Sequence, residues 1–217
     1  MTGSRPVLVV GASGYVGSRV VRGLAADGRA VLAAARRPLP DAGDTVIPVR
    51  YETVADLPDA VRAACDRAGA PLPGAVVASI GGWHKGAALL DDDPDRWTAT
   101  LASHLTAHLD AARALSPLLE PGDPYVVING SASREAMAGS GAICVTGAGL
   151  AMLVQVLRLE AAEAGSGAVR FHELVIDHAV AGDDRNVDPA QTRTAAQVVH
   201  ALGEVLDQPG APAVVHV

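Results

Sequence analysis

The chain has 217 residues and a mass of 22.0 kDa, with 49% apolar and 19% charged residues. This composition fits one globular domain with a full hydrophobic core and excludes an intrinsically disordered chain. The formal net charge is −7, and no basic stripe interleaved with aromatic residues occurs, so we expect no nucleic acid among the partners.

Two cysteines and one apolar run bear on the compartment. Cys65 and Cys144 lie far apart and outside any C-x-x-C motif, which is typical of free thiols in a reducing environment. The longest apolar run, Ala142–Leu157, has sixteen residues, whereas a membrane span needs about 20. The N-terminal residues lack the apolar stretch and cleavage site of a signal peptide. We therefore expect a soluble, cytoplasmic protein that binds no membrane.

Short apolar runs alternate along the chain with longer amphipathic segments. Strands are predicted at Val7–Val10, Ala30–Ala35, Thr45–Arg50, Gly74–Ser79, Tyr125–Asn129, Val169–Ile176 and Ala213–His216. Helices are predicted at Tyr15–Asp27, Val54–Ala68, Pro94–Leu115, Ala142–Ala164 and Thr194–Leu206. Nearly continuous Val, Ile and Ala runs are typical of parallel strands buried on both faces. The sequence therefore predicts an α/β fold, a Rossmann-like, doubly wound parallel sheet of about seven strands in a three-layer α/β/α arrangement, with residues 1–217 as one domain.

Three glycines separate the first predicted strand from the first predicted helix. Gly11, Gly14 and Gly17 have G-x-x-G-x-x-G spacing, which suits a tight turn whose backbone approaches a pyrophosphate closely. The helix that follows would present N–H groups and its positive dipole end to the phosphates. A purely structural turn is the alternative, but the position within a βαβ unit favours dinucleotide binding. The predicted cofactor residues here are Gly11, Ser13, Gly14, Tyr15, Val16 and Gly17.

The end of the second predicted strand distinguishes the two nicotinamide dinucleotides. An NAD site usually has an acidic residue about 20 residues past the glycines, where it binds the ribose 2′-hydroxyl. This chain has Arg36 and Arg37 at that point and no acid between Ala30 and Pro40. Because guanidinium groups bind phosphates bidentately, the pair favours NADP(H), although two solvated surface arginines would give the same pattern.

With these motifs the chain resembles the short-chain dehydrogenase/reductase family over nearly its whole length. Ser79-Ile80-Gly81-Gly82 is similar to the family's Asn-Asn-Ala-Gly, and Trp97 with His104-Leu105-Thr106-Ala107 is similar to its Trp-x6-Asn-Leu-x-Gly stretch. Val126–Ser133 resembles its fifth strand and catalytic-serine loop, and Leu157–Glu160 resembles the end of its Tyr-x-x-x-Lys helix. The resemblance implies that Ser79, Gly81 and Gly82 contact the cofactor and that the chain forms a homodimer or homotetramer through its two long helices.

The Tyr-x-x-x-Lys pair of that family is missing. Counting back from Glu160 places Ile143 at the tyrosine position and Gly147 at the lysine position. No tyrosine has a lysine four residues later, and the one lysine of the chain, Lys85, lies in another loop. The resemblance then implies His104 at the family's asparagine and Ser131 or Ser133 at its serine.

Polar residues that follow the predicted strands are the candidates for replacing the missing acid. Reduction of a carbonyl needs a proton donor beyond the carboxyl ends of the strands, and imidazoles donate protons near neutral pH. The candidate catalytic residues are Ser131, His104, His84 and His178. Each has a structural alternative: a backbone cap for the serine, a hydrogen-bonded helix residue for His104, and solvated loop residues for the other two. No His, Cys or acidic spacing indicates a metal site.

Three functions agree with this sequence. The first is an NADP(H)-dependent oxidoreductase of the carbonyl reductase type, with a non-standard active site and a small-molecule substrate. The second is a catalytically silent NADP(H) sensor or regulatory protein, and the third is a non-redox enzyme such as an isomerase, dehydratase or cyclase. The segment from Ala179 to Thr194 is shorter than the substrate lid that the family often has there, which predicts an open cleft or one completed by a partner subunit.

Overall fold

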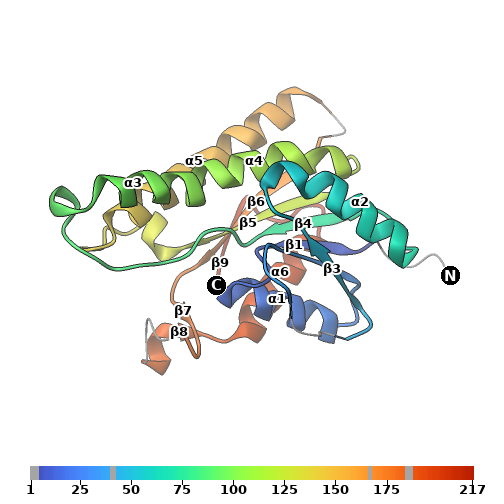
Figure 1. Ribbon diagram of the computed structural model, residues 1–217, viewed down its shortest axis with the longest axis horizontal. Helices are drawn as coiled ribbons and strands as arrows, with labels where there is room; N and C mark the ends of the chain where they lie inside the picture. The colour runs from blue at the N-terminus through green and yellow to red at the C-terminus, as the bar shows by residue number, and fades with distance from the viewer. Residues whose placement is uncertain (1–4, 40–42, 166–167, 184–187) are drawn as a thin grey trace.

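The computed structural model describes residues 5–39, 43–165, 168–183 and 188–217. Within them, seven parallel strands form one sheet in the order β3-β2-β1-β4-β5-β6-β9 (Figure 1). The strands are β1 (Val7–Val10), β2 (Val31–Ala35), β3 (Val46–Arg50), β4 (Ala75–Ala78), β5 (Pro124–Gly130), β6 (Arg170–Ile176) and β9 (Val214–His216). The predicted doubly wound α/β fold of about seven strands is confirmed.

Helices cover both faces of the sheet (Figure 1). The α-helices are α1 (Tyr15–Ala26), α2 (Leu57–Ala68), α3 (Pro94–Thr100), α4 (Ala107–Leu115), α5 (Gly141–Glu163) and α6 (Ala195–Asp207). Short 3₁₀ turns are η1 (Val54–Asp56), η2 (Leu89–Asp91), η4 (Ser116–Leu118), η5 (Ser131–Ser133) and η6 (Pro189–Gln191). Side chains of α1 and α6 enter one buried cluster, and side chains of α2, α4 and α5 enter the other.

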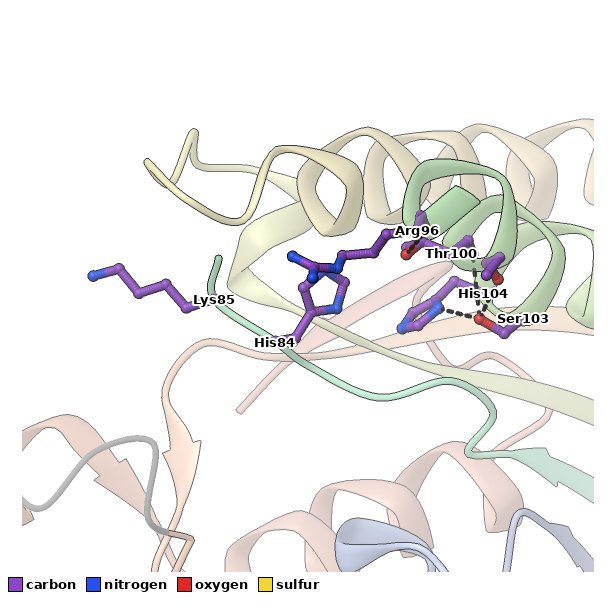
Figure 2. A pocket seen from close by; sticks show the side chains of 7 residues that line it. His84, Lys85, Arg96, Thr100, Ser103 and His104 are labelled. Atoms are coloured by element: carbon purple, nitrogen blue, oxygen red, sulfur yellow. Dashed lines mark hydrogen bonds between the residues drawn. The ribbon is translucent and has the colours of Figure 1, made fainter. Parts of the chain in front are cut away.

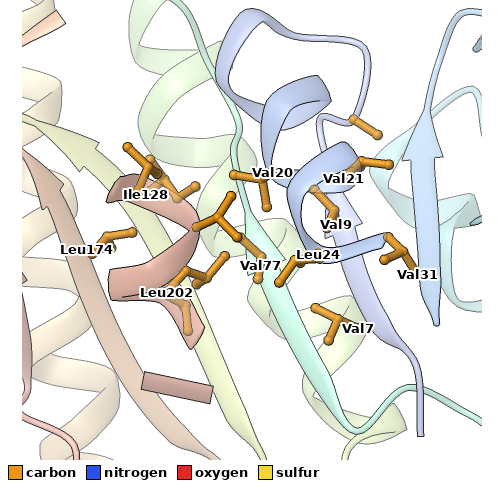
Figure 3. Packing of buried hydrophobic residues seen from close by; sticks show 14 of the residues in the cluster. Val7, Val9, Val20, Val21, Leu24, Val31, Val77, Ile128, Leu174 and Leu202 are labelled. Atoms are coloured by element: carbon orange, nitrogen blue, oxygen red, sulfur yellow. The ribbon is translucent and has the colours of Figure 1, made fainter. Parts of the chain in front are cut away.

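The strands are apolar along their whole length because alternate side chains enter opposite cores. Val7 and Val9 of β1 face the α1 and α6 side, with Leu24 and Leu202 (Figure 3). Leu8 and its alternate neighbour Val10 face the α2, α4 and α5 side. A strand that is buried on both faces has no polar side to present, and this explains the continuous apolar runs in the sequence.

The predicted helix Pro94–Leu115 is helical throughout, but it is not α-helical over its whole length. Between α3 and α4 lies a π-helical segment, η3 (Leu101–Thr106). Two hydroxyls bond back to the preceding turn there: Ser103 Oγ donates to the Ala99 carbonyl at 2.7 Å, and Thr100 Oγ1 donates to the Arg96 carbonyl at 2.8 Å. Such bonds compete with the regular helical pattern, and π-helical turns are frequent at functional sites. Periodicity alone does not reveal one extra residue per turn.

The polar segment after β6 contains two short strands that the sequence did not indicate. β7 (Ala179–Val180) pairs in parallel with β8 (Thr192–Arg193), and the Ala181 amide donates to the Arg193 carbonyl at 2.7 Å. Two-residue strands are too short to show any hydrophobic period. This small sheet connects β6 to α6 and lies beside the N-terminus of α1, because Tyr15 Oη donates to the Ala181 carbonyl at 2.9 Å.

The helix α5 is longer than the sixteen-residue run Ala142–Leu157, whose length led us to expect no membrane span. It has 23 residues, and its most apolar stretch of 18 residues has a mean hydropathy of 1.8, so among the described helices it alone is long and apolar enough to cross a membrane. Ile143, Thr146, Leu150 and Val154 on one side of it are buried in the protein. Length therefore does not exclude a membrane span, and the cytoplasmic location stays a prediction. Cys65 and Cys144 are both free thiols.

Candidate functional site

The glycine loop is packed so tightly that side chains do not fit in it. Gly11 has a φ of +82°, and a Cβ there would overlap the Ser79 carbonyl oxygen and lie 2.9 Å from the Ser79 carbonyl carbon. A Cβ at Gly17 would overlap the Gly11 carbonyl oxygen. The Gly14 amide donates to that same oxygen at 2.9 Å. The loop therefore lies directly against the end of β4 with its backbone uncovered, as a pyrophosphate site requires.

The N-terminus of α1 is suited to an anion. Gly14 is its N-cap, no side chain caps it, and its first turn contains no acidic residue. The amides of Tyr15, Val16 and Gly17 therefore meet no carboxylate that would compete with a phosphate. Ser13 is half-buried in the turn before them. These residues fit the pyrophosphate of a dinucleotide, through their backbone N–H groups above all.

The side chain of Tyr15 has a structural role in addition to its place in the loop. Its hydroxyl donates to the Ala181 carbonyl, and the Arg19 guanidinium lies 3.3 Å from the centre of its ring. A Cβ at Gly182, where φ is +83°, would lie 2.9 Å from the Tyr15 hydroxyl. Tyr15 thus fastens the segment after β7 over the start of α1, and its amide remains the group that can serve a cofactor.

Arg36 and Arg37 follow β2 at the same edge of the sheet. Register places Ala34 opposite Val10, so both arginines come just beyond the level of the glycine loop. Their side chains are exposed and make no ion pair or hydrogen bond with the rest of the described chain. Burial raises the pKa of Tyr51, and the charge of Arg36 opposes that rise, which shows how near the guanidinium lies. Two uncompensated guanidiniums at this point fit a 2′-phosphate.

His104 holds the loop after β4. Its Nε2 accepts a hydrogen bond from the Gly82 amide at 2.8 Å and lies 2.6 Å from the Gly82 carbonyl oxygen. Ser103 Oγ, whose own proton goes to the Ala99 carbonyl, lies 3.0 Å from Nδ1. Nδ1–H therefore donates to Ser103 and Nε2 accepts from Gly82 in the neutral ring, while a protonated ring donates to the Gly82 carbonyl instead. A Cβ at Gly81 would lie 2.7 Å from the ring.

A second histidine near this loop is kept neutral by burial. His108 of α4 is 2% exposed, its Nε2–H donates to the Ile80 carbonyl at 3.2 Å, and its Nδ1 has no partner within the described residues. Burial lowers its pKa to about 4, partly opposed by the bond to Ile80. Because the unfolded state binds the proton more readily, folding stability is intact above pH 6.5 and falls as the pH drops from 6.5 toward 4.

We expect this histidine alone to remove about 3 kcal/mol of stability between pH 7 and pH 4. Urea unfolding of wild type and His108→Gln at both pH values measures it, and the variant should lose about 3 kcal/mol less than wild type. His200→Gln, at an exposed position on α6, is the control and should follow wild type. Equal losses in wild type and His108→Gln would show that this group does not govern acid stability.

The two positions at which the resemblance would place a tyrosine and a lysine are closed by packing. Ile143 is buried in the first turns of α5. A Cβ at Gly147 would lie 3.1 Å from Ser133 Cα and 3.2 Å from its amide nitrogen, because η5 packs against the helix. Ser133 is itself structural, since it is buried and donates to the Gly130 carbonyl at 2.7 Å. Backbone therefore fills the space that a lysine side chain at position 147 would enter.

A buried carboxylate stabilises this end of the sheet. Glu173 of β6 is 1% exposed, and its oxygens accept from Asn129 Nδ2 at 2.8 Å and from Arg134 at 2.6 Å. Asn129 Nδ2 also donates to the Gly147 carbonyl at 3.0 Å, so β5, β6 and α5 are linked through one amide. The sequence reasoning missed Glu173, although an acid within the apolar run Arg170–Ile176 was an available signal.

The structure brings some of the candidate catalytic residues together and leaves others apart. His84 and His104 both line a cavity between the loop after β4 and α3 (Figure 2). Ser131 and His178 do not line it, but they follow β5 and β6, where register pairs Gly130 with Ile176. Their side chains are half-buried and make no hydrogen bond with another described residue. In the part of the chain that the structure describes, no group of three His, Cys, Asp or Glu is placed to hold a metal.

Solved structures share the architecture of this chain, although no protein-family profile and no curated protein sequence matches it. Among solved structures, a short-chain dehydrogenase from Burkholderia cenocepacia J2315 in complex with NADP has a TM-score of 0.78 at 21% identity, over 99% of this chain and 88% of that one. A gluconate 5-dehydrogenase from the same organism, in complex with NADP and tartrate, has a TM-score of 0.79 at 18% identity, over 99% and 94%.

A third neighbour contains the other cofactor. The NADH-dependent reductase A1-R′, complexed with NAD, has a TM-score of 0.77 at 15% identity, over 99% of this chain and 95% of that one. The three neighbours thus include both NADP and NAD complexes on one architecture. The resemblance seen in the motifs is confirmed at the level of structure, and the chain has the short-chain dehydrogenase/reductase fold.

Proposed function

We propose that this protein is an NADP(H)-dependent oxidoreductase of the short-chain dehydrogenase/reductase type that reduces a carbonyl group of a small molecule. The observation that carries the proposal is the glycine loop against β4, with an uncapped α1 N-terminus and two uncompensated arginines after β2. Neighbours of this fold hold NADP or NAD, so the fold does not choose between them. Arg36 and Arg37 favour NADP(H), because a 2′-phosphate gives them a partner.

The chemistry beside the cofactor has to differ from a tyrosine-lysine mechanism. A bound nicotinamide supplies the hydride, and the protein supplies a hydrogen bond or a proton to the substrate oxygen. Among the described residues the hydroxyl of Ser131 has no partner and can donate such a bond, while its carbonyl accepts from the Arg134 and Glu135 amides. His178 follows β6, the strand paired with β5, so its imidazole comes at the same edge of the sheet and could transfer a proton. Ser131 and His178 are the pair we assign to the substrate, while His104 positions Gly82.

Arg36→Ala tests the cofactor assignment. We expect its affinity for NADPH to fall about tenfold or more, because one charge-assisted contact to the 2′-phosphate is lost, while its affinity for NADH changes less than about twofold. Fluorescence titration of both dinucleotides measures this. Arg22→Ala is the control, since that arginine is exposed on α1 and donates to the Ser18 carbonyl of its own helix at 3.2 Å. Wild-type protein that binds neither dinucleotide would overturn the proposed function.

A catalytically silent NADP(H)-binding protein is the second candidate, favoured by the packing of η5 against Gly147. Stopped-flow absorbance with NADPH and a broad panel of ketones and aldehydes separates the two. A reductase oxidises NADPH in proportion to product, and Ser131→Ala slows it about 100-fold or more if the hydroxyl stabilises the oxyanion. NADPH binding without oxidation across the panel would favour the silent protein.

We also propose that the chain forms a homodimer, or a homotetramer built from it, through α5. Val145, Met152, Val156 and Leu159 are exposed and recur on one side of that helix. An apolar stripe of this kind marks an interaction surface in a soluble protein. Light scattering should give at least twice the 22.0 kDa of one chain, and Met152→Glu should lower the mass to that of one chain. Wild-type protein with the mass of one chain would contradict this assembly.

A further inference from the structure

A cavity of about 470 Å³ lies between the loop after β4 and the helix that begins at Pro94 (Figure 2). Its volume is in the range of small-molecule sites. The described residues that line it include no acid and are His84, Lys85, Arg96, Ala99, Thr100, Ser103 and His104. The lining thus combines basic side chains with hydroxyl groups, and one acid outside the lining, Asp92, pairs with Arg96.

The walls of the cavity are fixed by contacts outside it. Ser140 Oγ, which is buried at the start of α5, donates to the His84 carbonyl at 3.1 Å. The Gly86 amide donates to the Gly139 carbonyl at 2.7 Å, and His104 holds Gly82 on the other side. The loop that forms one wall is thus tied to two helices, so its shape does not depend on a ligand.

Arg96 is the central cation of the cavity. Its guanidinium donates to Asp92 at 3.0 Å, and a Cβ at Gly86 would lie 2.8 Å from the same nitrogen, so a glycine there gives the guanidinium its room. Asp92 uses one of five N–H donors. In the view of Figure 2 the guanidinium overlaps the His84 ring, and Lys85 is directed away. Arg96, His84 and His104 all line the cavity. Lys85 therefore adds charge at the rim, and Arg96 and His84 provide contacts.

We infer that this cavity binds a small organic anion, whose carboxylate or phosphate group is held by Arg96 and His84. A guanidinium recognises either group through paired N–H donors, and the imidazole adds one donor. Asp92 offsets part of the charge of Arg96, so the attraction for an anion comes from the remaining N–H donors of the guanidinium, from His84 and from Lys85 at the rim. The inference rests on the cavity alone and holds whether or not the chain reduces a carbonyl.

Isothermal titration of the full chain with succinate, with inorganic phosphate and with the neutral succinamide tests the inference. We expect saturable binding of succinate or phosphate and none of succinamide. Arg96→Gln should weaken the binding about tenfold or more. Arg113→Gln is the matched control, because that arginine is also helical and exposed, lies 3.7 Å from Asp110, and does not line the cavity. His84→Gln is a second variant with the same expected loss.

Each outcome decides the inference. Binding of succinate alone identifies a carboxylate ligand, binding of phosphate alone identifies a phosphate ligand, and both support the site if Arg96→Gln or His84→Gln weakens them. The inference is overturned by absence of saturable binding up to about 10 mM, by equal affinity in Arg96→Gln and Arg113→Gln with His84→Gln also unchanged, or by succinamide that binds as tightly. NADPH titration of the same variants is a separate readout and should match wild type, since the glycine loop is untouched.

Discussion

Gly11→Ala should abolish measurable NADPH binding and destabilise the protein by about 3 kcal/mol or more. The new Cβ would overlap the Ser79 carbonyl oxygen, and φ at this position is +82°, which an alanine rarely adopts. Because Gly11 and Ser79 directly follow the paired strands β1 and β4, the loop can admit a side chain only by moving away from the strand end. That movement also displaces the backbone that we assign to the pyrophosphate, so we expect an affinity loss of about 100-fold or more.

Gly28→Ala is the matched control for this substitution. Gly28 also has a positive φ, +79°, but a Cβ there would meet nothing within 4 Å. Gly28→Ala should therefore lower the free energy of unfolding only by what a positive φ costs an alanine, about 1–2 kcal/mol, and should leave the NADPH affinity unchanged. Urea unfolding and NADPH fluorescence titration measure both variants. If Gly11→Ala were as stable and bound NADPH as tightly as Gly28→Ala, the close packing of the loop on β4 would not matter.

Glu173→Gln should destabilise the protein by about 2 kcal/mol, because a buried carboxylate loses its charge-assisted bond to Arg134, whose side chain is 36% exposed to solvent. The carboxylate is 1% exposed and accepts from Arg134 at 2.6 Å and from Asn129 at 2.8 Å. Since Asn129 also donates to the Gly147 carbonyl, we expect the loss of stability to extend to α5 and η5. Urea unfolding at pH 7 measures the loss, and hydrogen exchange of the α5 amides shows where it acts.

Asp59→Asn removes an ion pair at the exposed surface and is the comparison for Glu173→Gln, which removes the charge of a buried carboxylate. Asp59 and Arg62 lie 3.5 Å apart on the surface of α2, and the aspartate side chain is 94% exposed. Water and salt screen such a pair, so its loss should change stability by less than about 0.5 kcal/mol. Similar losses in Asp59→Asn and Glu173→Gln would mean that the buried network adds nothing beyond an ordinary surface pair.

The network around Asn129 and the glycine at 147 belong to one arrangement at the ends of β5 and β6. η5 lies against Gly147, Ser133 bonds within its own turn, and Asn129 bonds to both the helix and Glu173. Hydrogen bonds to backbone and a buried ion pair thus support this edge where the resembling family has a tyrosine-lysine pair. A reductase with this architecture would have to place its substrate oxygen near Ser131 and His178 instead of near positions 143 and 147.

The sequence by itself determined the sheet, because strands buried on both faces leave continuous apolar runs and tight βα turns leave glycines. It also determined that the Tyr-x-x-x-Lys pair is missing, since one lysine and three tyrosines allow no register that forms it. The glycine loop and the two arginines after β2 could be recognised in the sequence because each motif consists of a few neighbouring residues.

Only the tertiary structure decided the rest of the site. Three hydrogen bonds, from Gly82 to His104, from Asn129 to Glu173 and from Ser140 to His84, join residues 22, 44 and 56 positions apart. Contacts between such distant residues leave no periodic or compositional trace, because either partner alone looks like an ordinary polar residue. The residues that line the cavity around Arg96 are close in sequence, but the cavity depends on how the loop after β4 and the helix that begins at Pro94 are placed, and distant contacts such as the one between Ser140 and His84 fix that placement.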